Sequence, residues 1–266
     1  MAQVTGTYSV YDAKGLREDL TDIIYSIAPT ETPFMSGIGK ESATAVLHEW
    51  QTDSLASAVA NNAQIEGDEI SFSAPSSTTR VNNRTQISRK SVIVSGTLDS
   101  VSKAGRNNEL AYQISKASKE LKRDMESSLT ANNSPVVGDD STARELAGLA
   151  GWIQTNNDAG SGGANGQVSS VDVPGTARTD GTQRAFTESQ LKSVIKKCWD
   201  EGGDPSMVML GSFNKQVLSG FTGGSTRFDP AENKRLVAAV DVYESDFGAL
   251  TVVPNRFSRA RDVFVL

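Results

Sequence analysis

The stretch LVAAVDVYESDFGALTVVPNRF, residues 236–257, decides the fold class of this chain of 266 residues. Two runs with high strand propensity, 236–243 and 250–253, flank the polar turn ESDFG at 244–248. A further apolar run, 263–266, follows this stretch. The pattern predicts a strand-rich module, and no residue type in it points to catalysis.

Helical signals precede this module. Thr187 and Gln190 have the spacing of a capping box. Apolar residues then recur at helical spacing, at Leu191, Val194, Ile195, Cys198 and Trp199. The run 207–210 predicts a short buried strand, and Ser212 is expected to cap a second short helix. This order of helices and strands predicts a compact α+β lobe at 181–266.

The segment 107–130 is predicted to be the longest helix. Its apolar stripe is one side chain wide and consists of Leu110, Ile114, Ala117, Leu121, Met125 and Leu129. The other faces are charged, and the pairs Lys116–Glu120 and Lys122–Glu126 lie four residues apart, where side chains meet on a helix surface. At 1.5 Å per residue, this segment gives a rod about 36 Å long. We expect it to lie across a sheet or along one lobe.

Residues 1–40 are predicted to form an N-terminal arm and a helix. Residues 1–11 are small and polar and have no apolar period, which is typical of an extended arm. Apolar residues with helical spacing follow at 12–28, where Asp12 is the expected N-cap. Pro29 and Pro33 are expected to stop this helix and to impose extended backbone.

Residues 41–98 are predicted to form an extended β-ribbon. Alternating residues predict a strand at 44–53, a small and polar stretch follows, and 76–98 is rich in Ser, Thr and Val. The region has too few large apolar side chains for a core of its own, and an isolated two-stranded ribbon is marginal in water. We therefore expect it to leave the body and pack on another copy. The alternative is an ordinary surface hairpin with scattered charge.

The charges of this ribbon are unevenly distributed. Acidic residues come first, at Asp53, Glu66, Asp68 and Glu69, and basic residues follow, at Arg80, Arg84, Arg89 and Lys90. Complementary charges of this kind set the register between neighbours more than they add affinity. The candidate inter-subunit contacts are therefore Trp50, Ile70, Phe72, Arg80, Arg84, Arg89 and Lys90.

Composition excludes several classes of protein. The net charge of −6 and the pI near 5.0 argue against a free-standing nucleic-acid binder, which needs clusters of Lys and Arg. The single cysteine, Cys198, excludes an intramolecular disulfide framework and a cysteine-based metal cluster. No apolar run approaches the roughly 20 residues of a membrane helix. The first residues lack a signal-peptide pattern, so we expect a protein made in a cytoplasm.

Candidate catalytic and ligand-binding residues are few. His48 is the only histidine and is expected to be an ordinary strand residue, while Cys198 lies on an apolar helix face as a small hydrophobe. Asp139-Asp140 lacks further ligands at metal-binding spacing and predicts a polar turn. The run 156–166 predicts a flexible loop, because it lacks the spacing of a phosphate-binding motif. We expect no catalytic site, no cofactor and no metal, with His48 or a pair of carboxylates left as the enzymatic alternative.

Several pieces of the chain, in order, resemble the major capsid proteins of tailed double-stranded-DNA bacteriophages. They are YDAKGLREDLTDIIYSIAPTETPFMSGIGK (11–40), ELAYQISKASKELKRDMESSLTAN (109–132), LAGWIQTN (149–156), FTESQLKSVIKKCWDEGGDP (186–205) and residues 240–257. The resemblance implies an α+β, HK97-like capsid fold. In that fold 1–40 is the N-terminal arm, 41–98 is the extended β loop lying over an adjacent subunit, and 99–180 is the peripheral domain with the spine helix 107–130. Residues 181–266 are then the axial domain, and part of the peripheral domain returns at the C-terminus.

The same resemblance implies a structural virion protein that self-assembles into the icosahedral capsid around the phage DNA genome. Its expected partners are its own copies in hexamers and pentamers, portal, scaffold or decoration proteins, and the DNA, bound without specificity; no membrane is involved. Assembly is expected in the host bacterial cytoplasm. The alternatives are a tail or decoration protein and, third, an enzyme. Proteins of this group commonly continue past a point like Leu266, so the chain is either truncated, incomplete as printed, or a short member.

Overall fold

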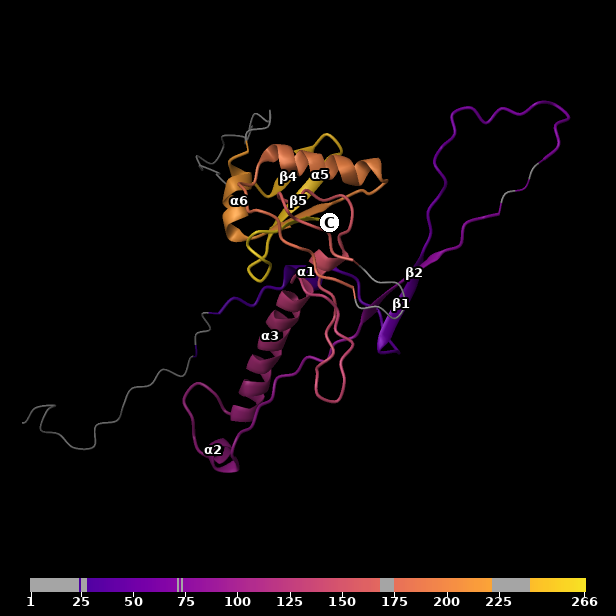
Figure 1. The fold of residues 1–266 in the computed structure, drawn as a ribbon. Coiled ribbons are helices and arrows are strands. Elements are labelled where there is room, and N and C mark those ends of the chain that lie inside the picture. Colours follow the sequence, from indigo (N-terminus) through magenta and orange to yellow (C-terminus); the bar gives the residue numbers. More distant parts are fainter. Residues whose placement is uncertain (1–23, 25–27, 71, 73, 168–174, 222–239) are drawn as a thin grey trace, which may run out of the picture. The chain divides into compact units, whose positions relative to one another are not determined.

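The computed structural model describes residues 24, 28–70, 72, 74–167, 175–221 and 240–266 (Figure 1). The predicted arm 1–11, most of the predicted helix 12–28 and residues 236–239 of the first strand run lie outside the described residues. Helices and strands are mixed, as predicted. Their order is α1 (Pro33–Gly37), β1 (Leu47–Thr52), β2 (Thr79–Arg84), α2 (Gly96–Ser100), α3 (Glu109–Leu129), α4 (Leu149–Trp152), α5 (Glu188–Asp200), β3 (Met207–Leu210), α6 (Ser212–Ser219), β4 (Val242–Ser245), β5 (Gly248–Pro254) and β6 (Val263–Val265).

The chain divides into two compact units, and α3 crosses from one to the other. The smaller unit comprises 1–30 and 90–120, and the larger comprises 31–89 and 121–266. The larger unit contains both β-sheets, a two-stranded one of β1 and β2 and a four-stranded one in the order β4-β5-β3-β6. In the second sheet β3 is parallel to β5, whereas β4 is antiparallel to β5 and β6 is antiparallel to β3.

The four-stranded sheet has an apolar core on each face, because successive strand residues point to opposite sides. On one face, Val208 and Leu210 of β3 pack with Leu250 and Val252 of β5, with α5 and with Leu218 of α6. On the other face, Met209 and Phe264 pack with Phe34 of α1 and Ala150 of α4. The strand runs predicted at 207–210, 250–253 and 263–266 are thus confirmed as the centre of this lobe.

The starts of α5, α6 and α1 show where local sequence signals predict a helix boundary correctly and where they do not. The Thr187 side chain accepts a hydrogen bond from the Gln190 backbone N–H, and the Gln190 side chain accepts one from the Thr187 backbone N–H, so the predicted capping box is confirmed. The cap predicted at Ser212 is wrong, since Gly211 is the N-cap of α6 and makes no side-chain bond. Pro33 does not impose extended backbone either. It begins the short helix α1, a position where the missing N–H costs nothing.

The glycine-rich run predicted to be a flexible loop instead pairs with a later segment. Backbone bridges join Ala164 to Thr179 and Gln167 to Thr176. Two glycines let these chains touch: a Cβ on Gly160 would lie 2.2 Å from the Thr182 carbonyl oxygen, and one on Gly181 would lie 2.3 Å from the Gly160 carbonyl oxygen. The glycines therefore serve close backbone packing, which composition alone cannot distinguish from flexibility.

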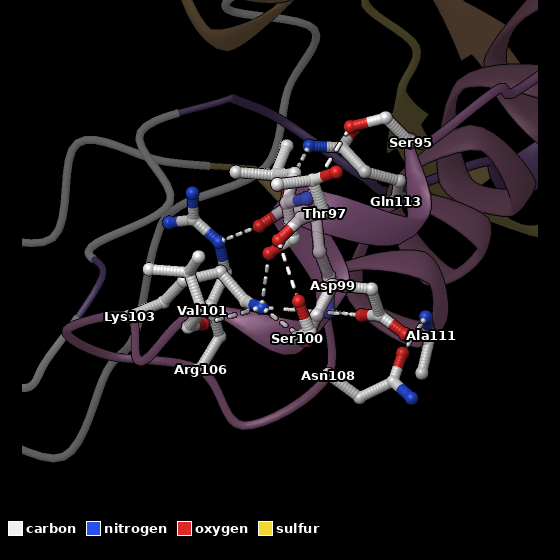
Figure 2. Close-up of polar contacts among 12 residues, drawn as sticks. Ser95, Thr97, Asp99, Ser100, Val101, Lys103, Arg106, Asn108, Ala111 and Gln113 are labelled. Atoms are coloured by element: carbon white, nitrogen blue, oxygen red, sulfur yellow. Dashed lines mark hydrogen bonds and ion pairs between the residues drawn. The ribbon is translucent and has the colours of Figure 1, made fainter.

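The smaller unit is held together by polar contacts between α2 and α3 (Figure 2). The Lys103 ammonium donates to the backbone carbonyls of Leu98 (2.7 Å), Asp99 (2.9 Å) and Val101 (3.0 Å), and so satisfies the C-terminal end of α2. The Asp99 carboxylate in turn accepts a hydrogen bond from the Glu109 backbone N–H at the start of α3, at 3.1 Å. These hydrogen bonds fix the turn between the two helices.

Candidate inter-subunit surface

Strands β1 and β2 form the base of the predicted ribbon. They pair antiparallel, with Leu47 opposite Arg84 at one end and Thr52 opposite Thr79 at the other. The strand predicted at 44–53 is confirmed, whereas only six residues of the run 76–98 pair as a strand. Residues 53–78 connect the strands, and their described part runs out from the strand ends as a long loop (Figure 1).

The base of the ribbon is anchored to the larger unit. The Asn83 side chain donates to the Ala147 carbonyl at 3.3 Å and accepts from the Ala147 N–H at 2.9 Å, so one amide satisfies both backbone groups of a residue. The Trp50 ring stacks on Trp152, with 5.0 Å between centroids and 26° between planes. The Gln86 side chain also accepts from the Leu146 N–H. The base therefore has a defined position on its own subunit.

The loop 53–78 leaves its apolar side chains in water. Five large ones are 70% exposed or more: Leu55, Val59, Ile65, Ile70 and Phe72. Single exposed apolar residues are normal on a protein surface, but a concentrated group marks an interaction site. The loop is therefore the strongest candidate in the described chain for contact with another molecule.

The loop 53–78 contains a tight turn that is surrounded by acidic residues. The Asp68 N–H donates to the Ile65 carbonyl at 3.2 Å, and Gly67 has a φ of +82°, which is typical of a type II turn. Acidic residues surround this turn at Glu66, Asp68 and Glu69, and no Lys or Arg occurs anywhere in 53–78. A complementary partner surface is consequently apolar and positively charged.

The seven predicted contact residues fall into three groups. Trp50, Arg80 and Arg84 lie in the anchored base, where Arg80 forms an ion pair with Glu49 of the facing strand and Arg84 is half-buried. Ile70 (76% exposed) and Phe72 (93% exposed) lie in the loop. Arg89 and Lys90 follow the ribbon and are exposed. Contact of any of these residues with a neighbouring copy stays a prediction.

His48 and Cys198 have the surroundings of structural residues. The His48 ring lies 5.8 Å from Trp50 within the ribbon. Cys198 is half-buried, and this burial raises the pKa of its thiol, which is the opposite of what activates a nucleophile. Asp139 forms the predicted polar turn, because its carboxylate accepts from the backbone N–H groups of Ser141 and Thr142, both at 2.7 Å. Among the described residues no three His, Cys, Asp or Glu side chains gather as a metal site.

Glu126 is an important residue that the sequence interpretation placed wrongly. It was predicted to lie on the charged surface of the long helix beside Lys122, yet its side chain is fully buried. Its Oε1 accepts from the Phe34 N–H (2.8 Å) and from the Asn255 amide (2.6 Å), and its Oε2 accepts from the Met35 N–H (2.8 Å). The carboxylate thus fixes the first turn of α1 against α3. The only local signal was Pro33, which marks a helix start that needs an acceptor.

The smaller unit presents a second exposed apolar surface. Five large apolar side chains in its described part are 43–97% exposed: Ile93, Leu98, Val101, Leu110 and Ile114. The predicted stripe of α3 is therefore not buried at its N-terminal end. No described helix is long and apolar enough to cross a membrane.

Comparison with known proteins gives a family match and a relative. The family model described as SU10 major capsid protein matches residues 3–266. The major capsid protein of Escherichia phage Phieco32 is 28% identical over 279 aligned residues, which cover 93% of this chain and 79% of that protein.

Proposed function

Because the chain belongs to the SU10 major capsid protein family and is a structural, capsid-forming protein of a phage virion, we propose that its copies join through the loop 53–78 into an icosahedral shell. The observation that carries this proposal is the contrast within the ribbon. Its base is anchored by Asn83 and Trp50, while Ile70 and Phe72 beyond the base remain in water. Burial of apolar surface contributes about 25 cal/mol per Å², so a neighbouring copy is the natural site for these side chains.

The proposed architecture is the HK97-like capsid fold. In this assignment α3 is the spine helix of the peripheral domain 99–180, the ribbon is the extended loop 41–98, and the lobe 181–266 is the axial domain. Residues 1–40 form the arm that reaches neighbours. The mixed α+β fold, the length of α3 and the solvent-exposed loop support this assignment.

The proposed partners follow from the same assignment. Copies of the chain assemble as hexamers and pentamers in the host bacterial cytoplasm, with portal, scaffold or decoration proteins, and they enclose DNA that they bind without sequence specificity. Many modest interfaces act together in such an assembly, so each needs little affinity alone. Trp50, Arg80, Arg84, Arg89 and Lys90 are proposed to set the register of the ribbon on its neighbour. We propose no catalytic role.

The experiment combines sedimentation velocity with negative-stain electron microscopy. The double substitution Ile70→Asp with Phe72→Asp is expected to abolish closed particles and to leave a folded subunit with an unchanged Tm, because both side chains are exposed in the single chain. The matched control, Asn61→Asp with Asn62→Asp, adds the same two charges to the same loop but removes no apolar group. Normal yields of particles from the Ile70/Phe72 variant would refute the role of the loop. Failure of the unsubstituted protein to assemble under any condition would count against self-assembly itself.

A further inference from the structure

A cavity of about 310 Å³ lies in the larger unit beside α5 and β6. Its apolar part is formed by Leu191, Val194 and Cys198 of α5, with Phe186 and Val265. An engineered apolar cavity of about 150 Å³ holds one benzene molecule. This cavity therefore has room for a phenyl ring together with a branched aliphatic side chain.

The polar part of the cavity carries a net positive charge. Three guanidinium groups line it, those of Arg178, Arg184 and Arg261, against the two carboxylates of Asp158 and Asp262. Arg184 is paired with Asp158 at 2.6 Å and Arg261 with Asp180 at 3.2 Å, whereas the Arg178 Nε is buried without a hydrogen-bond partner. A positive cavity in a chain of net charge −6 favours an occupant that brings an acidic group.

The wall of the cavity is preformed. It includes Gly160 and Gly181, whose backbones touch so closely that neither position has room for a Cβ. The Thr182 N–H donates to the Ser161 carbonyl at 2.9 Å beside this contact. Because the wall is fixed in the single chain, an occupant meets a cavity that is already open and loses little to reorganisation.

We propose that this cavity receives Asp68, Glu69, Ile70 and Phe72 of the loop 53–78 from a second copy of the chain, an inference that rests on the proposed function and names the receiving surface. Ile70 and Phe72 are two residues apart, so in extended backbone both side chains point the same way and enter the apolar part together. Asp68 and Glu69 directly precede them and lie at the arginine-lined part. The loop supplies acidic and apolar groups with no cation, and the cavity supplies the complement of both.

The single cysteine of the chain gives a direct test, because Cys198 lines the cavity. Ile70→Cys and Phe72→Cys are each introduced singly, particles are assembled, and the thiols are oxidised or joined by a short bismaleimide. We expect a ladder of covalent multimers on denaturing gels. The ladder is expected to disappear when Cys198→Ala is added. Leu55→Cys, an equally exposed position elsewhere in the loop, is expected to give no Cys198-dependent ladder.

The outcomes separate this inference from the proposed function. Intact particles without a Cys198-dependent ladder at either position overturn the docking site and leave the shell assignment standing. A fast-migrating monomer band also overturns it, since it shows docking within one chain. Absence of particles from the unsubstituted protein contradicts the proposed function instead.

A peptide experiment tests the same docking without assembly. The peptide QIEGDEISFSA, residues 64–74, is added to the full chain that carries Ile70→Asp and Phe72→Asp, and the rate at which Cys198 reacts with a thiol reagent is measured. We expect the peptide to slow labelling at least threefold, and we expect QIEGDESSSSA to have no effect. Arg184→Gln should reduce the protection. Equal labelling rates with both peptides contradict the inference.

Discussion

Glu126→Gln is the substitution that tests the buried polar contacts most sharply, because it keeps the shape of the side chain and changes only its hydrogen-bonding groups. The Glu126 carboxylate accepts three hydrogen bonds, two on Oε1 and one on Oε2. The amide can place its oxygen at the Oε1 position and keep Phe34 and Asn255 as donors. Its NH₂ group then faces the Met35 N–H, and two donors are left opposed.

The expected loss of stability follows from this geometry. A hydrogen bond to a charged group contributes about 1.5–3 kcal/mol, and one such bond is removed. Part of this loss is offset, because a neutral amide costs less to bury than a carboxylate. We expect the free energy of unfolding to fall by about 2 kcal/mol for Glu126→Gln. Glu126→Ala removes all three bonds, and we expect a fall of about 4 kcal/mol.

The assay is urea unfolding in the background of Ile70→Asp with Phe72→Asp, which is expected not to assemble, so that dissociation of particles does not enter the measurement. The midpoint should shift while the m-value stays constant. Lys122→Gln is the control, because the exposed Lys122 is the partner that helical spacing assigns to Glu126. A Glu126→Gln protein as stable as its parent, beside a destabilised Lys122→Gln protein, would refute the reasoning and restore the surface ion pair.

Two further predictions concern other contacts. Trp152→Ala removes the ring that Trp50 stacks on. Because an aromatic pair contributes about 0.5–1.5 kcal/mol beyond its buried area, we expect faster amide hydrogen exchange in β1 and β2. Unchanged exchange in these strands would contradict the anchoring role of the pair. Hydrogen bonds from Ser141, and then from Thr142, lower the pKa of Asp139 from 3.8 to about 2. Since the folded pKa of Asp139 lies below the unfolded one, the stabilisation is complete above pH 4 and is lost as the pH falls towards 2. The difference in unfolding free energy between the unsubstituted protein and Asp139→Ala should therefore shrink across that window. A constant difference would contradict the role of these hydrogen bonds.

Local signals in the sequence predicted those elements whose causes are local. The capping box at Thr187 and the apolar period of α5 lie within a few residues of each other, and they placed the start of this helix correctly. The helix predicted at 107–130 corresponds closely to α3, Glu109–Leu129, for the same reason. Strand runs in the lobe were also found, since alternation and branched side chains are properties of short segments.

Errors arose where a residue's role depends on partners far away in the chain. Glu126 looks like an ordinary surface residue until Phe34 and Asn255, 92 and 129 residues distant, are placed beside it. Gly160 and Gly181 have the composition of a linker, and only their mutual contact shows why side chains are excluded. The cavity beside α5 was missed because its lining comes from four separate segments, none of which carries a binding motif.

The anchored base and the long loop of the ribbon have a geometric consequence for a closed shell, whose curvature varies from place to place. Roughly 26 residues, doubled back on themselves at about 3.3 Å each, span about 40 Å. If the loop contacts neighbouring copies as proposed, neighbours that are tilted by different amounts can be reached by changes in the loop alone, while Asn83 and Trp50 keep their contacts with the larger unit. In the proposed assembly, the change that accommodates curvature then lies in the loop 53–78, outside the four-stranded sheet and its cores.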